Sequence, residues 1–311
     1  MTAPQTARAV DSSQAPRPRG AWLRRRRNAA ALLWVIPALA MYATFELYPL
    51  TQTVRYSFYR WDGIGVATWS GFDNYVGVFT NAEQFASVVH AFVLIIFFTV
   101  IPVGLGLIAA AIIRDLRRGP FASVTQVVLF LPQVLPLAAA GIIWTWIYAP
   151  DGMFNGFLRA IGLGAITRDW LSDFDFALPA VGVIGSWVSL GFCTVLPLAG
   201  IGKIDPSLYE AARLDGANRV QEFFAVTLPG LRREIVVACS VTIIAALSSF
   251  DVIYVATNGG PGYQTLVPGL EIYHLTFTSQ QVGSASALAV VLTVLILAVV
   301  IPLQRLGRRE S

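Results

Sequence analysis

The residue types that could act on a partner are concentrated in one short segment, residues 209–230, which reads YEAARLDGANRVQEFFAVTLPG. Just before it, Asp205 and Pro206 favour a helix start, because an aspartate side chain accepts from free amide groups and a proline at the first helical position loses no hydrogen bond. Gly216 predicts a sharp turn, since glycine adopts positive φ angles without steric cost. Asn218 can cap a second short helix. We therefore expect a helix–turn–helix.

The composition of this segment is typical of a docking surface. Ala211, Ala212 and Ala217 would let the backbone of a partner approach closely, and charged side chains surround them. These charged residues are Glu210, Arg213, Asp215 and Arg219. Pro229 is expected to close the unit. The alternative is an amphipathic helix that rests on a lipid surface with its arginines near phosphate groups.

Patterns that support catalysis are missing from the sequence. Residues 200–203 read GIGK, but a phosphate-binding loop would need glycine in place of Pro197 and a hydroxyl in place of Ile204. The sequence has no nucleophile elbow and no zinc-protease motif, and the two cysteines and two histidines show no metal-ligand spacing. We predict no catalytic residue, no metal site and no cofactor in this chain.

The rest of the chain must hold this segment in place, and its very apolar composition indicates which kind of elements do so. Hydrophobic residues make up 56% of the chain and charged residues only 13%, with a mean hydropathy of +0.64, whereas about a quarter of a soluble domain is charged. A helix needs about 20 apolar residues to cross a bilayer. We predict an all-α polytopic membrane protein with six transmembrane helices, near residues 29–50, 88–113, 124–148, 177–199, 235–256 and 285–303.

The basic residues predict the orientation of these helices. Most of the 22 lysines and arginines lie before the first apolar stretch and after the second, fourth and sixth, and such residues favour the cytoplasmic side. Both termini are therefore expected in the cytoplasm, and the net charge of +4 needs no nucleic acid to explain it. Residues 1–20 predict a disordered cytoplasmic tail. Residues 21–311 predict one transmembrane domain, with the charged loop at 201–230 and a first helix that is not cleaved.

Polar and aromatic residues inside the apolar stretches could line a route for a solute. The candidates are Gln133, Trp144, Trp187, Ser189, Ser248, Asp251 and Tyr254. Aromatic faces beside hydroxyl groups suit a sugar. The alternative is that serine hydroxyls bond to their own helix, and that Asp251 is structural and caps the turn at 258–262.

The segment 209–230 resembles the inner loop of the membrane permeases of binding-protein-dependent ATP-binding-cassette (ABC) importers. That loop carries E-A-A, three residues, G, nine residues and I-x-L-P. This chain has Glu210-Ala211-Ala212, Gly216 and Val226-Thr227-Leu228-Pro229 at that spacing, with valine in place of isoleucine. Residues 56–61, 71–75 and 250–265 are similar to the carbohydrate-uptake, maltose-type branch and to the first of its two permeases.

The resemblance implies a set of partners and site residues. The loop would insert into a cytoplasmic ATPase and couple it to the transmembrane helices. The coupling residues would be Glu210, Ala211, Ala212, Arg213, Asp215, Gly216, Ala217, Leu228 and Pro229. An outer loop would face an extracytoplasmic solute-binding protein through Asn258, Gly259, Gly260, Pro261 and Thr265.

The implied assembly contains a second permease and two copies of a P-loop ATPase, which would hold ATP and magnesium. The chain would be a multi-pass protein of a prokaryotic cytoplasmic (inner) membrane, in contact with membrane lipid and without enzymatic activity of its own. The expected cargo is a sugar or oligosaccharide. Alternative cargoes are a polyol or a glycerol phosphate ester. Alternative functions are a stand-alone secondary transporter or channel and, as the least favoured, a membrane-embedded enzyme.

Overall fold

The computed structural model describes residues 34–115 and 120–308. The predicted tail at 1–20, the start of the first apolar stretch and the basic residues 117 and 118 lie outside these ranges. The chain divides into two compact units, Met1–Gln52 and Thr53–Ser311. The single transmembrane domain at 21–311 stays a prediction.

The described part of the first unit is helical. Residues 34–42 form an α-helix that continues through the π-helical η1 (Ala43–Leu47) into α2 (Tyr48–Tyr56). The described part of the predicted stretch at 29–50 is therefore helical, as expected.

The second unit begins with the end of α2, which a small antiparallel ribbon follows. Strand β1 (Tyr59–Arg60) pairs with β2 (Thr68–Trp69), with Tyr59 opposite Trp69. The helix α3 (Asp73–Thr80) follows, and its Asn74 side chain donates to the carbonyl oxygens of Ser57 and Tyr59, each at 2.9 Å. The rest of the described unit is helical or irregular, so the prediction of a mainly helical protein is confirmed.

Within the described residues, three helices are long and apolar enough to cross a membrane: Ala82–Arg114, Ala177–Ile201 and Val282–Gly307. The first is built from α4 (Ala82–Ile95), the π-helical η2 (Ile96–Val100) and α5 (Ile101–Asp115). The second is α9 (Ala177–Ile201), and the third lies in α16 (Val282–Arg308). Candidate membrane helices are thus present, but fewer than the six predicted spans are single long helices.

The predicted stretch at 124–148 is bent rather than straight. It contains α6 (Pro120–Phe130), the 3₁₀ turn η3 (Leu131–Val134) and α7 (Leu137–Tyr148), and the helical segments on either side of the break meet at 101°. Pro136 explains the break, because a proline disfavours the helical conformation of the residue before it. Leu135 is extended, with ψ of 134°. If the bent pair counts as one span, up to four candidate spans are described.

The predicted stretch at 235–256 is divided into two helices. The helix α13 (Arg232–Leu247) ends before residues 248–250, and the short α14 (Asp251–Ala256) follows. The remaining elements after α7 and α14 are short. They are α8 (Met153–Ala160), η4 (Gly164–Ile166), α15 (Pro268–Tyr273) and η6 (His274–Thr278).

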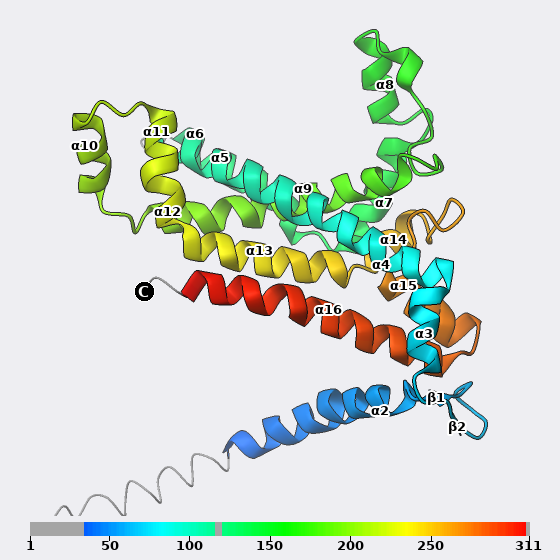
Figure 1. Cartoon of the computed structure of the whole chain (residues 1–311). Helices are drawn as coiled ribbons and strands as arrows, with labels where there is room; N and C mark the ends of the chain where they lie inside the picture. The colour runs from blue at the N-terminus through cyan, green and yellow to red at the C-terminus, as the bar shows by residue number, and fades with distance from the viewer. Residues whose placement is uncertain (1–33, 116–119, 309–311) are drawn as a thin grey trace, which may run out of the picture. The chain divides into compact units, whose positions relative to one another are not determined.

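Close packing of α5 against α9 organises the second unit. A side chain at Gly106 would overlap the backbone of Cys193, and one at Gly185 would overlap the ring of Phe98, so small residues let the helices approach closely. The core beyond this contact includes the fully buried Ile253. In Figure 1, α10 lies near the end where α5 stops and α13 begins, whereas α7 and α14 lie at the opposite end.

Candidate functional site

The first half of the charged segment is a helix with the predicted start and stop. Helix α10 (Pro206–Leu214) is capped by Asp205, whose carboxylate accepts from the backbone amide of Ser207 at 2.9 Å. This hydrogen bond holds the pKa of Asp205 below its usual value. Gly216 has φ of +81°, a conformation that glycine adopts at little cost. The predicted break at this glycine is confirmed.

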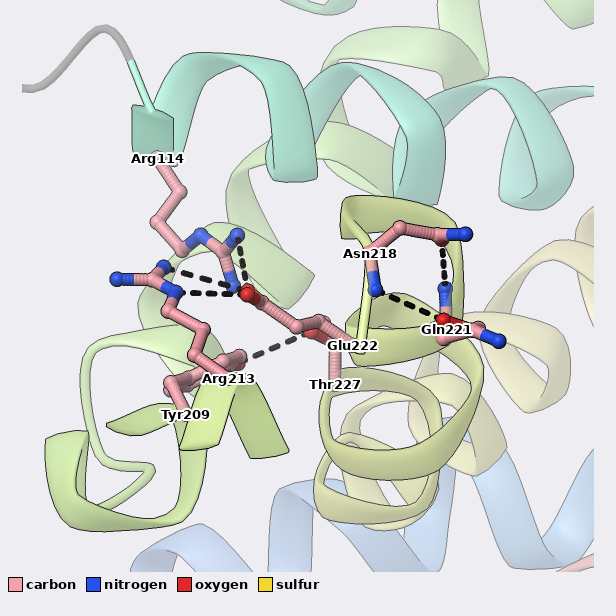
Figure 2. Close-up of polar contacts among 7 residues, drawn as sticks. All are labelled: Arg114, Tyr209, Arg213, Asn218, Gln221, Glu222 and Thr227. Carbon is pink, nitrogen blue, oxygen red and sulfur yellow. Dashed lines mark hydrogen bonds and ion pairs between the residues drawn. The ribbon is translucent and has the colours of Figure 1, made fainter. Parts of the chain in front are cut away.

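The second half is also a helix, but it is longer than predicted. Asn218 and Gln221 form a reciprocal cap at distances of 2.8 and 3.0 Å between backbone nitrogen and side-chain oxygen (Figure 2). Helix α11 (Arg219–Glu222) then continues through η5 (Phe223–Thr227) into α12 (Leu228–Gly230). Pro229 lies in α12, which ends one residue later at Gly230, so the unit closes next to the predicted position and ahead of α13.

The helix–turn–helix presents its predicted docking residues at the surface. Glu210, Ala211, Arg213, Asp215, Gly216 and Pro229 are exposed, and Ala212, Ala217 and Leu228 are partly buried. Sequence reasoning missed the apolar part of this surface. Its members are Leu208, Leu214, Val220 and Phe224, which are exposed by 54%, 89%, 65% and 61%. A leucine directly before the Asp215-Gly216 turn was the available signal.

A buried carboxylate lies behind this surface, and Figure 2 shows the side chains that surround it. Glu222 is 3% exposed. Its carboxylate accepts from Arg213 at 2.7 Å from Nε and 3.3 Å from the second guanidinium nitrogen. Arg114, in the last turn of α5, lies 3.9 Å from the same carboxylate. The three charged groups therefore join α10, α11 and α5.

Tyr209 and Thr227 lie next to this carboxylate. The Tyr209 hydroxyl is 3.0 Å from Thr227 Oγ1. The Arg114 guanidinium stacks 4.5 Å from the centre of the Tyr209 ring and donates to Thr227 Oγ1 at 3.5 Å. Sequence reasoning singled out neither Glu222 nor Arg114, because a position within a helix does not reveal which distant helix it meets.

The solute-route candidates fall into separate groups, of which the first surrounds a cavity. Trp144 of α7 and Trp187 of α9 meet edge to face, with ring centres 5.7 Å apart. Both line a cavity of about 720 Å³, together with Tyr148, Phe154 and Trp170. The indole nitrogen of Trp144 is buried and has no hydrogen-bond partner within the described ranges.

The second group lies at the break between α13 and α14. Asp251 is exposed at the first position of α14, and Tyr254 stacks on Phe250 with ring centres 5.2 Å apart. The Ser248 hydroxyl donates to the Ile244 carbonyl of its own helix at 2.6 Å. This local bond is the alternative considered from the sequence for single serines.

Two further candidates belong to neither group. Gln133 is exposed in η3, and Ser189 is partly buried in α9. Neither lines the cavity around Trp144. The structure therefore does not bring all seven solute-route candidates to one place.

The outer-loop candidates form a compact turn. Asn258, Gly259 and Gly262 have positive φ angles of 48°, 87° and 51°. Thr265 is fully buried and donates to the Gly260 carbonyl at 2.7 Å. The Thr265 hydroxyl also lies 2.7 Å from that of Thr257. Thr265 thus shapes the turn from inside, whereas Asn258 is exposed on it.

Known proteins resemble this chain over nearly its full length. The diacetylchitobiose uptake permease NgcF of Streptomyces coelicolor is 32% identical over 92% of this chain and 86% of its own length. The sulfoquinovosyl glycerol transport permease SmoG of Agrobacterium fabrum is 33% identical over 97% of both chains.

A solved structure shares the fold. A chain of a bacterial ABC transporter involved in the import of alginate superposes with a TM-score of 0.79 at 21% identity, covering 93% of this chain and 99% of that one. Residues 102–310, more than half of the chain, match one family. The chain therefore belongs to the family of inner membrane components of binding-protein-dependent transport systems.

Proposed function

We propose that this chain is the permease subunit that carries a sugar or oligosaccharide through an ATP-driven importer. The observation that carries the proposal is the helix–turn–helix at 206–230, which exposes small, charged and apolar side chains together at one end of the helices. The exposure of the apolar Leu214 side chain to water is unfavourable, and burial by a partner would remove that cost. Large exposed apolar patches commonly mark contact surfaces. This surface is the coupling site for a separate ATPase.

The cavity around Trp144 and Trp187 supports a carbohydrate as cargo. Aromatic rings offer apolar faces, and the unpartnered indole nitrogen of Trp144 is a donor for a hydroxyl oxygen. Relatives named for the uptake of diacetylchitobiose and sulfoquinovosyl glycerol also support a carbohydrate as cargo. A polyol or a glycerol phosphate ester is the second candidate. A phosphate ester would favour a cationic wall, and the cavity residues carry no cationic side chain.

The proposed topology has six spans with both termini in the cytoplasm. The three long helices supply three spans, and the bent pair of α6 and α7 supplies a fourth. The divided pair of α13 and α14 and the helix that contains residues 34–42 supply the others. The helix–turn–helix then lies on the cytoplasmic side, and the turn at 258–262 lies outside.

The proposed partners follow from this topology and from the family. A second permease would complete the pathway, this chain being the first of the two, and two P-loop ATPase subunits with ATP and magnesium would bind the two inner loops. An extracytoplasmic solute-binding protein would face Asn258, Gly260 and Pro261, whereas Gly259 is buried and, with Thr265, supports that turn. The chain itself is the membrane component and not an enzyme.

Uptake by cells that express the complete importer tests the proposal. The probes are ¹⁴C-labelled diacetylchitobiose, lactose and maltose. We expect wild-type cells to accumulate at least one of these sugars. Gly216→Pro should abolish accumulation because it alters the turn, and Glu210→Lys should abolish it because it reverses a charge of the docking surface. Asp175→Lys, an equal charge reversal at another exposed loop position, is the control and should retain uptake.

Two results would contradict the proposal. Normal uptake by both docking variants at normal expression would favour the alternative, in which the helix–turn–helix is a surface helix that rests on lipid. Uptake that continues without ATP but stops when the proton gradient is collapsed would favour a secondary transporter.

A further inference from the structure

Helix α10 is attached to the rest of the protein through few side chains. Among its described residues, only Tyr209 is buried. The attachment includes the Tyr209 contacts with Thr227 and Arg114 and the pairing between Arg213 and Glu222. These side chains and the backbone turn connect α10 to the long helices.

Glu222 is the centre of this attachment because it pairs with two helices at once. Its carboxylate takes the bidentate contact from Arg213 of α10 and lies 3.9 Å from Arg114 at the end of α5. Removing a carboxylate from water is costly unless cations and hydrogen bonds compensate it. At 3% exposure, Glu222 depends on both guanidinium groups.

The geometry of these contacts also fixes the orientation of α10. The paired hydrogen bonds of an arginine and a carboxylate fix orientation as well as distance, so Arg213 and Glu222 hold α10 at a set angle to α11. Arg114 ends the long apolar helix that begins at Ala82, and α5 packs directly on α9. A shift of Arg114 would therefore be passed to the helix that carries Trp187.

We propose that Glu222 is a positioning residue that transmits the movement of α10 to α5 through Arg213 and Arg114. This inference rests on the proposed function of the segment as the ATPase coupling site. It adds two residues that lie outside the sequence pattern of that loop, since position 222 falls in the unspecified stretch between Gly216 and Val226, and Arg114 belongs to another helix. Glu222 touches neither the solute nor the nucleotide in this role.

The test uses the complete importer in proteoliposomes with Glu222→Gln, Arg114→Gln and the double variant. The transported probe is the sugar that the wild type accumulates fastest. Three quantities are measured: the amount of ATPase that co-purifies, the rate of ATP hydrolysis, and the amount of sugar accumulated per ATP hydrolysed. We expect normal co-purification and at least about a tenfold fall in sugar per ATP for each single variant, the scale of a lost charged hydrogen bond. The double variant should be no worse than the poorer single variant, because both changes break one connection.

Glu234→Gln is the matched control. Glu234 is a partly buried carboxylate 3.4 Å from Lys203, and its described ion pair includes neither α10 nor α5. This variant should keep the wild-type amount of sugar per ATP. A merely structural role of Glu222 would lower co-purification, hydrolysis and uptake in proportion, which would overturn the inference.

Additive losses in the double variant, or normal sugar per ATP in Glu222→Gln, would also overturn it. Failure of the proposed function would look different. In that case the wild-type chain itself would bind no ATPase or accumulate none of the sugars.

Discussion

Leu214 shows how a single side chain can indicate a binding surface. It ends α10 with 89% of its side chain exposed, beside the exposed Asp215 and the turn at Gly216. An apolar side chain in this position gains nothing from the fold that contains it, and it would gain from burial by a partner, by about 25 cal/mol for each Å² removed from water. The energetic centre of an interface is commonly a few such side chains inside a polar rim.

We predict that Leu214→Asp abolishes the binding of the ATPase without unfolding the permease. The side chain makes little contact within the chain, so the thermal unfolding temperature should stay within a degree or two of the wild type. Binding should fall at least about tenfold, as for the loss of a central anchor. The measurement is the amount of ATPase that co-purifies with the tagged permease.

Val66→Asp is the matched control for this prediction. Val66 is 90% exposed and lies between β1 and β2, outside the helix–turn–helix. Equal loss of the ATPase in both variants would mean that a new surface charge, rather than the site at Leu214, disturbs the assembly.

Two glutamates of the same segment differ because their surroundings differ. Glu210 is exposed on α10, where a carboxylate can meet a partner but contributes little to stability. Glu222 is buried between two guanidinium groups, where its removal leaves uncompensated charges. Exposure thus separates the proposed docking residue from the proposed positioning residue twelve positions later in the chain.

At the level of elements, α10 is a short helix that depends on its ends. It has nine residues, and isolated helices of this length are unstable in water. The Asp205 cap and the Gly216 turn compensate for part of this weakness, because they satisfy amide groups and end the helix at a defined residue. The angle at which α10 presents Leu214 is therefore set by these two ends.

We predict that the Asp205 cap stabilises α10 in a pH-dependent manner. Its folded pKa is lowered by the hydrogen bond from the Ser207 amide, so the ionised form stabilises the helix. The effect should be complete above the unfolded pKa of about 4 and should disappear as the pH falls through the lower folded value. Asp205→Ala should speed amide exchange in residues 207–214 severalfold at pH 7, measured by hydrogen–deuterium exchange with correction for intrinsic rates.

Asp205→Asn is the control, since asparagine caps helices about as well as aspartate but does not titrate. It should keep the protection of α10 at pH 7. If the difference between the alanine variant and the wild type did not shrink as the pH is lowered stepwise below the unfolded pKa of about 4, the ionised carboxylate would not be the cause.

At the level of the whole second unit, the contact between α5 and α9 connects the two ends of that unit. In Figure 1, α10 and the end of α5 lie at one end of this unit, and α7, which carries the cavity residue Trp144, lies at the other. Gly106 allows α5 to approach the backbone of α9 at Cys193. Tightly packed helices respond to a shift as units, because an interior without voids transmits strain.

We predict that Gly106→Ala destabilises the permease by about 1–3 kcal/mol, the usual cost of overpacking. Its added methyl group would overlap the Cys193 carbonyl. Gly104→Ala, two residues earlier on the same helix, is the matched control, because its methyl group would meet nothing within 4 Å. That variant should be neutral or more stable by up to ~1 kcal/mol, since alanine favours helix.

Thermal unfolding in lipid nanodiscs measures both variants. Equal unfolding temperatures for Gly106→Ala and the wild type would mean that α5 and α9 can separate without cost. That result would remove the packed route from Arg114 to the cavity.

The sequence predicted those features that depend on neighbours a few positions apart. The cap at Asp205, the turn at Gly216 and the cap at Asn218 all arise from contacts within three residues, and each is present. The predicted stretches at 177–199 and 285–303 are also continuous helices, because runs of apolar residues without a break favour one. The spacing from Glu210 to Pro229 was enough to indicate the family, since it reflects one local structure.

The sequence by itself therefore determined the helical membrane class and the helix–turn–helix at 206–230 with its turn, whereas only the tertiary structure decided which side chains meet. Arg114 and Thr227 are 113 residues apart, yet they share one hydrogen bond beside Glu222. Trp144 and Trp187 line the same cavity, while Asp251 and Tyr254 lie at the break after α13. The physical reason is that caps and turns are fixed by short-range backbone geometry, but burial and pairing depend on which helices pack together.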